Sequence, residues 1–220
     1  LQEWSVSDPL QHPPLAAVLA SLYNYADYIS EALESVRAQT QKGIELIIVD
    51  DASTDSGSTL VERWIEDCLN TDRHPFVRVL FLRHEKNAGL AAARNTAFDQ
   101  SQAPWSFVLD ADNLLFPDAV SGCLSLADKA DPDLAVVHPL LAVDAEIGRP
   151  DDLRTLVSSA SWQQERLKTG NVVDAMALVR RSAWEVVGGY THIQGGWEDY
   201  DFWCKLVAAG FYGIQCPRIL

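Results

Sequence analysis

Hydrophobic residues follow two alternating patterns along this chain: continuous runs, and runs with helical spacing. The continuous runs predict buried strands and lie at 16–22, 44–49, 77–82, 105–109 and 134–137. Helices with one apolar face or a high alanine content are predicted at 27–39, 60–68, 89–98 and from Pro117 onward. Apolar strands separated by helices are typical of a mostly parallel sheet covered on both faces. The pattern therefore predicts an α/β fold.

The regular alternation stops after about residue 145. The remaining predicted elements are a helix over 151–168, a strand over 175–179, a turn at 188–189 and a helix over 198–209. No internal repeat, low-complexity tract or linker divides the chain, so one domain is the simplest organisation. Residues 1–14 are polar, contain three prolines and are expected to be a lead-in segment. The domain itself is expected over 15–220, with a first half at 15–115 and a second half at 116–220.

The chain is strongly acidic, with 17 Lys and Arg against 31 Asp and Glu and a net charge of −14. These acids are spread along the whole sequence, so the surface repels nucleic-acid backbones and anionic lipids. Nucleic acid is therefore excluded as a partner bound through a broad basic face. An anionic substrate would have to meet a local cluster of positive charge or a bound metal.

The cysteine pattern and the chain ends bear on location. The four cysteines, Cys68, Cys123, Cys204 and Cys216, form no CxxC pair, so we expect reduced thiols in a cytoplasmic protein. No apolar run reaches the roughly 18 residues of a membrane span, and no signal peptide is visible. The chain begins at Leu1 and ends within an apolar segment, so we expect a piece of a longer polypeptide. Any attachment to the inner face of the membrane would come from parts outside this chain, and the oligomeric state cannot be predicted.

Acidic residues follow two of the predicted strands directly. Asp50 and Asp51 end one strand, and Asp110 and Asp112 end another. Ligands of open α/β sheets bind at the carboxyl ends of the strands, and two short carboxylates there can share Mg²⁺ or Mn²⁺. Alternatively, the Asp-Ala-Asp-Asn sequence at 110–113 forms a simple turn, which these residues also favour.

Two further segments have an unusual local charge, one basic and one acidic. The run 83–94 is locally basic and leads into a helix at Gly89, where free N–H groups favour a phosphate; ordinary surface charge is the alternative. The run 195–203 places Glu198, Asp199 and Asp201 at a helix start, interleaved with the bulky aromatic residues Trp197, Tyr200 and Phe202. The acids there could simply stabilise the helix dipole. The interleaved aromatic residues favour a pocket wall in which a carboxylate acts as a general base.

These segments together resemble the family 2 glycosyltransferases of the GT-A fold over about residues 16–216. The motifs that carry the resemblance are, in chain order, Tyr23-Asn24, Gln39-Thr40, the Ile-Ile-Val-Asp-Asp-Ala-Ser-Thr-Asp run at 47–55, Asn87-Ala88-Gly89, Ala93-Arg94-Asn95, the Leu-Asp-Ala-Asp run at 109–112, Arg180 with Gly188-Gly189-Tyr190, and Glu198-Asp199. Each motif alone is weak, but their order and spacing are specific. The resemblance implies a single GT-A (Rossmann-like) domain, with a nucleotide-sugar-binding first half and an acceptor-binding second half cut short at its C-terminus.

The resemblance also implies roles for individual residues. Tyr23, Asn24 and Arg94 would lie beside or hold the nucleotide, and Asp51 would accept a hydrogen bond from its base, typically uracil. Asp110 and Asp112 would form the DxD motif, with Asp112 binding Mn²⁺ or Mg²⁺ and Asp110 near the ribose and the metal. Asp199 would be the general base, with Glu198 and Trp197 beside it in the acceptor pocket.

The implied reaction is an inverting single displacement. A sugar moves from a nucleoside diphosphate sugar, in the first place a UDP-sugar, to a saccharide or other hydroxyl acceptor. The family is common in bacteria that build surface polysaccharide, so such an acceptor is expected. Ser21-Leu22 departs from the Pro-Thr pair that is usual in the family, and Ala52 replaces a usual Gly.

Two other functions are compatible with parts of the sequence. The departure at Ser21-Leu22 leaves open a non-catalytic nucleotide- or sugar-binding module of the same fold. A DxD phosphohydrolase would use Asp110 as its nucleophile, but it expects Thr or Val at position 113 and the motif near the start of the fold. A dinucleotide oxidoreductase is excluded because the loop after the first predicted strand lacks GxGxxG.

Overall fold

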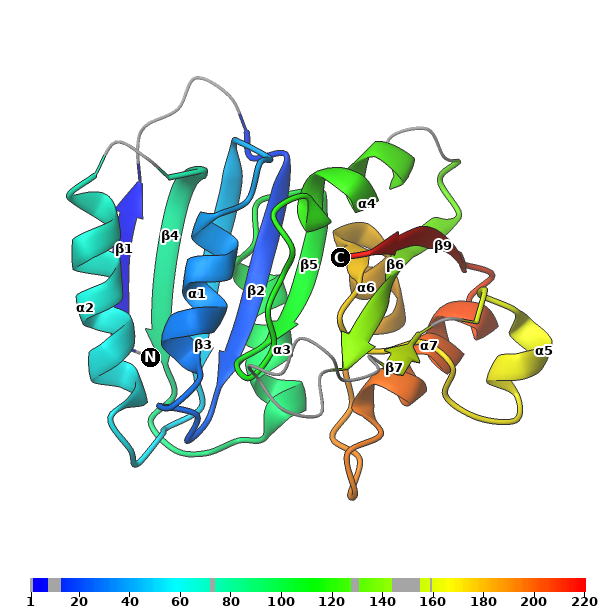
Figure 1. The fold of residues 1–220 in the computed structure, drawn as a ribbon. Helices are drawn as coiled ribbons and strands as arrows, with labels where there is room; N and C mark the ends of the chain where they lie inside the picture. Colours follow the sequence, from blue (N-terminus) through cyan, green and yellow to red (C-terminus); the bar gives the residue numbers. More distant parts are fainter. Residues whose placement is uncertain (1, 8–12, 72–73, 128–130, 144–154, 159) are drawn as a thin grey trace.

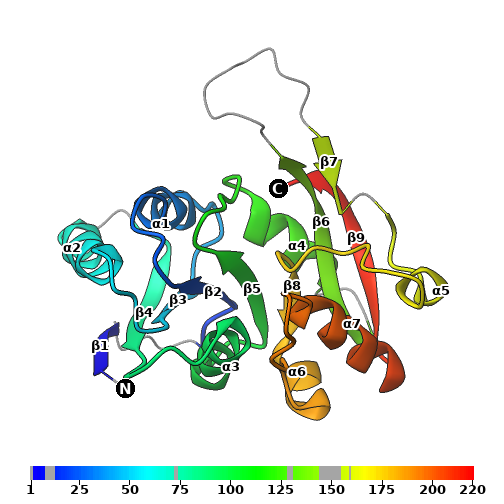
Figure 2. The same ribbon diagram turned by 90° about the horizontal axis from the view of Figure 1, so that it is seen from below.

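The computed structural model describes residues 2–7, 13–71, 74–127, 131–143, 155–158 and 160–220. The predicted α/β fold is confirmed, with helices on both faces of a sheet whose central strands are parallel (Figures 1 and 2). The strand order is β1-β4-β3-β2-β5-β8-β6-β7, and β9 pairs with β6. Among the described residues, no helix is both long enough and apolar enough to span a membrane.

The first half is built on four parallel strands with their carboxyl ends at one edge, the lower edge in Figure 1. They are β2 (Ala16–Leu22), β3 (Ile44–Asp50), β4 (Phe76–Arg83) and β5 (Trp105–Asp110). Every residue of β2 and β3 is buried, which explains their uninterrupted apolar sequences. The four predictions from these runs are confirmed to within one residue at each end.

Two hydrophobic cores cover the two faces of the sheet. Helices α1 (Ile29–Arg37), α2 (Gly57–Leu69) and α4 (Ala119–Ala127) pack on one face. Helices α3 (Leu90–Gln100), α6 (Arg181–Val187) and α7 (Glu198–Ala208) pack on the other face, as Figure 2 shows. Successive residues of β2 alternate between the two cores, as the side chains of a strand must.

The second half continues the sheet with short and mostly antiparallel pairings. Its strands are β6 (Leu134–Val143), β7 (Thr155–Val157), β8 (Leu178–Arg180) and β9 (Tyr212–Ile219). Strand β8 is antiparallel to both β5 and β6, and so joins the two halves into one sheet. The predicted strand at 134–137 is confirmed and extends further than expected.

Two predictions in the second half are wrong. The helix expected over 151–168 is reduced to α5 (Gln164–Leu167), because residues 155–157 pair with β6 and Ser158 has a positive φ of 54°; residues 151–154 lie outside the described part. The strand expected over 175–179 begins only at Leu178. The Met176 N–H donates to the Asp174 side chain at 2.9 Å, a local bond that competes with strand pairing.

The segment expected to be a lead-in also contains a strand. Residues Gln2–Ser7 form β1, which pairs antiparallel with β4 at the edge of the sheet. A polar sequence suits an edge strand, because such a strand does not have to be buried on both faces. The lead-in expectation is therefore corrected for residues 2–7, while residues 8–12 lie outside the described part.

Successive strands are added on opposite sides of β2, although all of them run parallel. Strands β3 and β4 follow it on one side, and β5 lies on the other side. In doubly wound sheets this switch point opens a crevice at the carboxyl ends of the strands. A binding site is therefore expected at the loops after β2, β3 and β5.

Candidate active site at the carboxyl edge of the sheet

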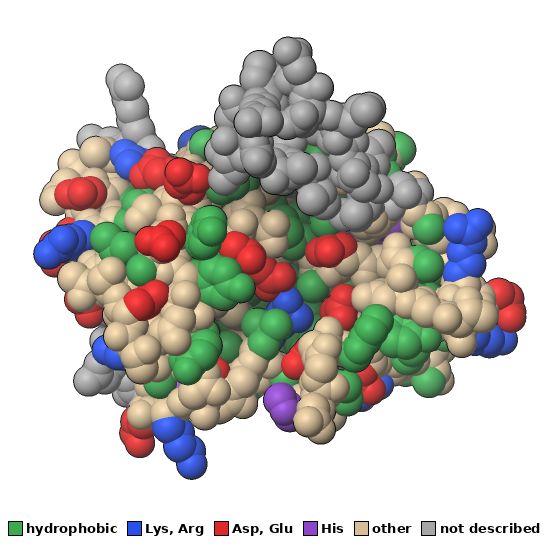
Figure 3. All heavy atoms as spheres, turned by 60° about the horizontal axis from the view of Figure 1, so that its bottom comes forward, with side chains coloured by type: hydrophobic (Ala, Val, Ile, Leu, Met, Phe, Trp, Pro, Cys, Tyr) green, Lys and Arg blue, Asp and Glu red, His purple; other side chains and the backbone are tan. Residues whose placement is uncertain are grey.

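A cavity of about 420 Å³ lies at this switch point. Its lining comes from the loops after β2, β3 and β5 and from the start of α3: Ser21, Leu22, Tyr23, Tyr25, Asp51, Asn87, Gly89, Leu90, Ala93, Asp110, Ala111 and Asp112. Figure 3 shows acidic and hydrophobic side chains gathered over the middle of this edge. The cavity thus brings together four of the residues chosen from the sequence, namely Tyr23, Asp51, Asp110 and Asp112.

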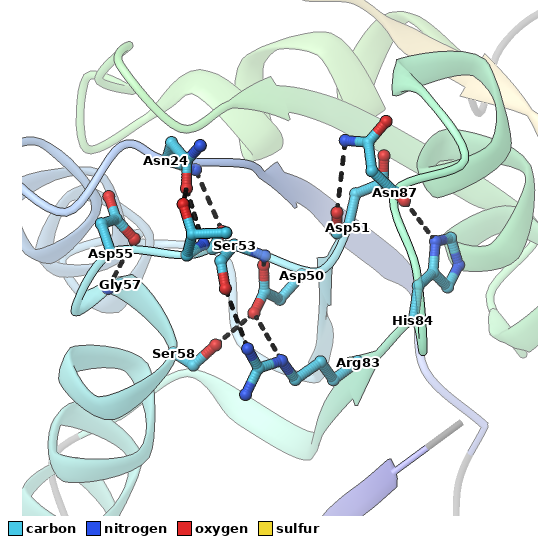
Figure 4. Close-up of polar contacts among 11 residues, drawn as sticks. Asn24, Asp50, Asp51, Ser53, Asp55, Gly57, Ser58, Arg83, His84 and Asn87 are labelled. Atoms are coloured by element: carbon cyan, nitrogen blue, oxygen red, sulfur yellow. Dashed lines mark hydrogen bonds and ion pairs between the residues drawn. The ribbon is translucent and has the colours of Figure 1, made fainter.

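Asp50 stabilises the loop after β3. Its buried carboxylate accepts hydrogen bonds from Ser53 N at 2.9 Å and from Ser58 Oγ, and it lies 3.3 Å from Arg83 Nε (Figure 4). The Arg83 guanidinium also donates to the carbonyl oxygen of Ser53. The partly exposed Arg83 therefore neutralises the buried charge of Asp50.

Asp51 is held by the start of helix α3. The backbone N–H groups of Ala88 and Gly89 donate to its two carboxylate oxygens at 2.9 and 2.7 Å, and His84 Nδ1 lies 2.6 Å from Oδ1. The N–H groups that we expected to bind a phosphate thus already bind a carboxylate of the protein. Asp51 still lines the cavity, and its contact with a base stays a prediction.

Tyr23 and Asn24 follow β2 and differ in their surroundings. Tyr23 is 43% exposed at the cavity wall. Asn24 has a positive φ of 59° and is tied to the next loop: its N–H donates to Ser53 Oγ, and its Oδ1 accepts from Thr54 N at 2.8 Å (Figure 4). Asn24 therefore joins the loop after β2 to the loop after β3, while the Tyr23 ring is exposed at the cavity.

Arg94 lies in α3 and holds the first acid of the DxD motif. Its side chain is 4% exposed, and Nη2 donates to Asp110 Oδ1 at 2.7 Å. Burial, the largest single influence, would lower the pKa of Arg94, but the charge of Asp110, its hydrogen bond and the charges of Tyr190 and Asp199 together raise this pKa, so the guanidinium stays charged. Two of the three cations in the basic segment, Arg83 and Arg94, are thus paired with acids of the protein.

Asp112 is exposed beside Asp110 at the cavity. Within the described residues, no group of three or more His, Cys, Asp or Glu side chains could hold a metal ion. The protein would therefore supply two carboxylates, Asp110 and Asp112, and other ligands would complete the shell. This oxygen donor set fits Mg²⁺ or Mn²⁺, which commonly keep water and phosphate oxygens among their ligands.

The second half adds Asp199 from the first turn of α7. Asn171 Nδ2 donates to Asp199 Oδ2 at 2.7 Å, and Asp199 is partly buried. Glu198 beside it is 6% exposed, whereas Trp197 is 53% exposed. Asp199 therefore has one oriented hydrogen bond and access to solvent, which suits a group that takes up a proton.

Asp174 and Tyr190, to which the sequence assigned no role, are both affected by the charges of acids from the two halves. Burial, above all, raises the pKa of Asp174, and the charges of Asp110 and Asp199 raise it further, while the bond from Met176 N opposes this. Burial also raises the pKa of Tyr190, again with contributions from Asp199 and Asp110. Both residues therefore lie in the electrostatic field of the DxD acid and of the proposed base. The sequence signal for Asp174 was that Asn171 and Asp174 are the polar residues of the otherwise apolar stretch 171–179.

Comparison with protein families gives a match to the model described as Glycosyl transferase family 2, over residues 18–188. The chain is 29% identical over 207 residues to chondroitin synthase of Escherichia coli, covering 93% of this chain and 28% of that protein. It is 27% identical over 200 residues to hyaluronan synthase of Pasteurella multocida, covering 90% of this chain and 19% of that protein. The chain thus spans less than a third of the length of either relative.

Solved structures share the fold. The mannosyltransferase PcManGT from Pyrobaculum calidifontis, in complex with GDP-Man and Mn²⁺, has a TM-score of 0.69 and 24% identity, covering 96% of this chain and 57% of that one. TarS of S. aureus (residues 1–349), in complex with UDP-GlcNAc, has a TM-score of 0.66 and 17% identity, covering 91% of this chain and 58% of that one.

Proposed function

This chain belongs to glycosyl transferase family 2, and from that premise we propose that it transfers a sugar from a nucleoside diphosphate sugar to an acceptor hydroxyl. The observation that carries the proposal is the meeting of the two halves at one edge of the sheet. Asp110 ends β5, Asp199 lies in the first turn of α7, and the charges of both act on Asp174 and Tyr190. This supports a donor site at Asp110 and a general base at Asp199 that act on the same substrate.

The proposed donor is a UDP-sugar bound in the cavity at the switch point. A volume of about 420 Å³ and a half-exposed Tyr23 ring suit a nucleotide. Two structural neighbours were solved with GDP-Man and with UDP-GlcNAc, which supports the nucleotide-sugar class. We assign Asp51 to the base and Arg94, through Asp110, to the diphosphate end.

Asp110 and Asp112 would hold a divalent cation, Mn²⁺ or Mg²⁺. The chemistry that such an ion supplies is neutralisation of the charge that grows on the departing diphosphate. Arg94 keeps the Asp110 carboxylate oriented toward the cavity and adds a fixed positive charge nearby. The acidity of this edge is then compatible with an anionic substrate.

In the proposed reaction, Asp199 accepts the proton of the acceptor hydroxyl. The hydroxyl oxygen forms a bond to the anomeric carbon of the sugar while the bond from that carbon to the phosphate oxygen breaks. The nucleoside diphosphate leaves with the electron pair of the broken bond, and the anomeric configuration inverts. Asn171 holds Asp199 in position for this step.

We propose a saccharide as the acceptor. Trp197 is exposed two residues before the proposed base, and aromatic rings bind the apolar faces of sugars. The names of the relatives, chondroitin synthase and hyaluronan synthase, favour a growing polysaccharide.

The donor site is tested by thermal shift. We expect a nucleoside diphosphate, UDP in the first place, to raise the melting temperature in the presence of Mn²⁺. Asp112→Asn should abolish this shift, whereas Asp67→Asn, the same change on the exposed face of α2, should retain it. Removal of the metal with a chelator should have the effect of Asp112→Asn. Absence of a shift with UDP, GDP and deoxythymidine diphosphate would refute the donor site.

The base is tested by turnover. Asp199→Asn should retain nucleotide binding and lose sugar transfer. Asp99→Asn is the control, because it makes the same chemical change at an exposed position of α3, away from α7. Equal turnover in wild type and Asp199→Asn would remove Asp199 from its role. Nucleotide binding without turnover in the wild type would favour the non-catalytic binding module.

A further inference from the structure

The side chain of Asn95 joins helix α3 to the turn that precedes the base. Its Nδ2 donates to the carbonyl oxygen of Tyr190 at 2.8 Å, and its Oδ1 accepts from Tyr190 N at 2.8 Å and from Trp184 Nε1 at 3.1 Å. The two bonds to the Tyr190 backbone connect residues 95 positions apart in the sequence. Asn95 is also the direct neighbour of Arg94, which holds Asp110.

We propose that Asn95 is a positioning residue that holds the helix of the general base at its working distance from the donor site; this rests on the function proposed above. The group of Asn95, Gly189, Tyr190 and Trp184 is called the clamp below. It acts through Tyr190, and no atom of Asn95 has to touch the substrate.

Gly189 is the residue that the clamp requires at its position. Its φ is 70°, and a Cβ atom there would lie 2.5 Å from Asn95 Oδ1 and 2.7 Å from Trp184 Nε1. Any other side chain would therefore push Asn95 and Trp184 apart. This explains the glycine before Tyr190 in physical terms.

Tyr190 connects the clamp to α7 through ring packing. Its ring stacks on Phe202 with centroids 4.3 Å apart, and Phe202 lies one turn after Asp199. On the other side, the Arg94 guanidinium lies 5.5 Å from the centroid of the Tyr190 ring. The ring thus lies between the residue that holds Asp110 and the helix that carries Asp199.

A second contact holds α7 to the same turn. Lys205 Nζ donates to the carbonyl oxygen of Gly189 at 3.0 Å and also to Thr191 Oγ1. Helix α7 is therefore fixed to residues 189–191 at two places, and residues 189–190 are fixed to α3 by Asn95. Small displacements matter here, because about 1 Å of misplacement in an active site can cost on the order of 100-fold in rate.

The test compares Asn95→Asp, Asn95→Ala and Gly189→Ala with Asp99→Asn, an exposed change on the same helix. Asn95→Asp retains the shape of the side chain but directs a carboxylate oxygen at the Tyr190 carbonyl. Three readouts are needed: nucleotide binding with Mn²⁺, release of nucleoside diphosphate from the donor with and without acceptor sugars, and native-state hydrogen exchange of the 188–202 backbone.

We expect the three clamp variants to bind nucleotide like the wild type and to show faster exchange over 188–202, with β2 and β5 unchanged. Acceptor-dependent kcat should fall about 10- to 100-fold while the donor KM stays within about 2-fold, because the base alone is displaced. Asp99→Asn should behave like the wild type in all three readouts.

Unchanged exchange over 188–202 in Asn95→Asp would overturn the clamp whether or not the protein transfers sugar. A parallel loss of nucleotide binding and kcat would also overturn it, since that result indicates a general loss of structure. Faster exchange with intact nucleotide binding, in a protein whose Asp199→Asn variant has normal turnover, would instead refute the base and leave the clamp as the link between the two halves.

Discussion

The two halves of the molecule hold their acidic side chains in different ways. In the first half, Asp50 and Asp51 each receive at least three contacts from N–H groups, hydroxyls or cations. In the second half, Asp199 receives one hydrogen bond from the described residues, that of Asn171. A carboxylate whose oxygens already have several hydrogen-bond or ion-pair partners stabilises a loop. A carboxylate with few partners can still accept a proton or bind a metal. This difference agrees with the roles proposed above for Asp112 and Asp199.

The largest expected effect tests how far the first half depends on its buried charges. Glu45 in β3 is fully buried; its Oε1 lies 2.9 Å from Arg78 Nη1, and its Oε2 accepts from the backbone N–H groups of Gln102 and Ala103. Glu45→Gln leaves Arg78 without its counter-charge and turns an amide toward N–H donors. We expect a loss of about 3 kcal/mol in the free energy of unfolding by urea titration.

The control for Glu45 is Glu165→Gln, which breaks an exposed pair with Lys168 and should change the stability little. Nucleotide binding should be unaffected in the folded fraction, because Glu45 lies at the amino end of β3, away from the cavity. Equal stability of the two variants would mean that buried charge does not stabilise the first half.

The second-largest expected effect is a pH dependence of stability in the second half, where the buried group is the neutral imidazole of His138. Burial lowers the pKa of His138 from 6.5 to about 4, and its Nε2 has no partner among the described residues. The protonated form is therefore favoured in the unfolded chain, so this contribution to stability is present above pH 6.5 and lost as the pH falls toward 4. Between pH 7 and pH 5 we expect His138 to account for a loss of about 2 kcal/mol.

This pH effect is measured as a difference. Urea unfolding at pH 7 and pH 5 should show a smaller loss of stability in His138→Gln than in the wild type, because glutamine cannot take up a proton. If both proteins lose the same stability over this range, His138 is not buried as a neutral group and the contrast between the halves is weaker.

The smallest effect compares one strained residue from each half. Ala52 has a φ of 62° and Ser158 a φ of 54°, both in the region that glycine adopts at low cost. Ala52→Gly should raise the free energy of unfolding by up to about 1 kcal/mol. Ser158→Gly should not, because Ser158 Oγ contacts His138 Nδ1 at 3.2 Å and accepts from Asp174 N at 3.3 Å. A gain of stability in both variants would show that the Ser158 contacts contribute nothing.

The sequence predicted the first half well for a physical reason. Strands β2, β3 and β5 are buried on both faces, so their residues have to be apolar and the runs mark the strands directly. Strands β7 and β8 have only three residues each, and their pairing partners decide where they lie. A helical pattern over 151–168 therefore did not prevent a strand at 155–157.

The candidate site was predictable in its residue types but less so in its contacts. The acids at the strand ends could be chosen because the topology brings strand ends together. That Asp51 binds the start of α3, and that Asn95 binds Tyr190, depends on the three-dimensional packing of segments 37 and 95 positions apart. Asp174 was missed because its significance comes from the charges of Asp110 and Asp199 around it.

The carboxylate of Asp51 bears on how a nucleotide could enter the cavity. It binds the N–H groups of Ala88 and Gly89, so the cavity wall there already carries a negative group. Asp110 and Asp112 line the same cavity, and with the cation proposed above they would join the protein to a diphosphate. Under the proposed function, phosphates placed against Asp51 would meet repulsion, whereas phosphates placed at the cation would be held. Asp51 would then help to select the orientation of the ligand before any contact with the sugar is made.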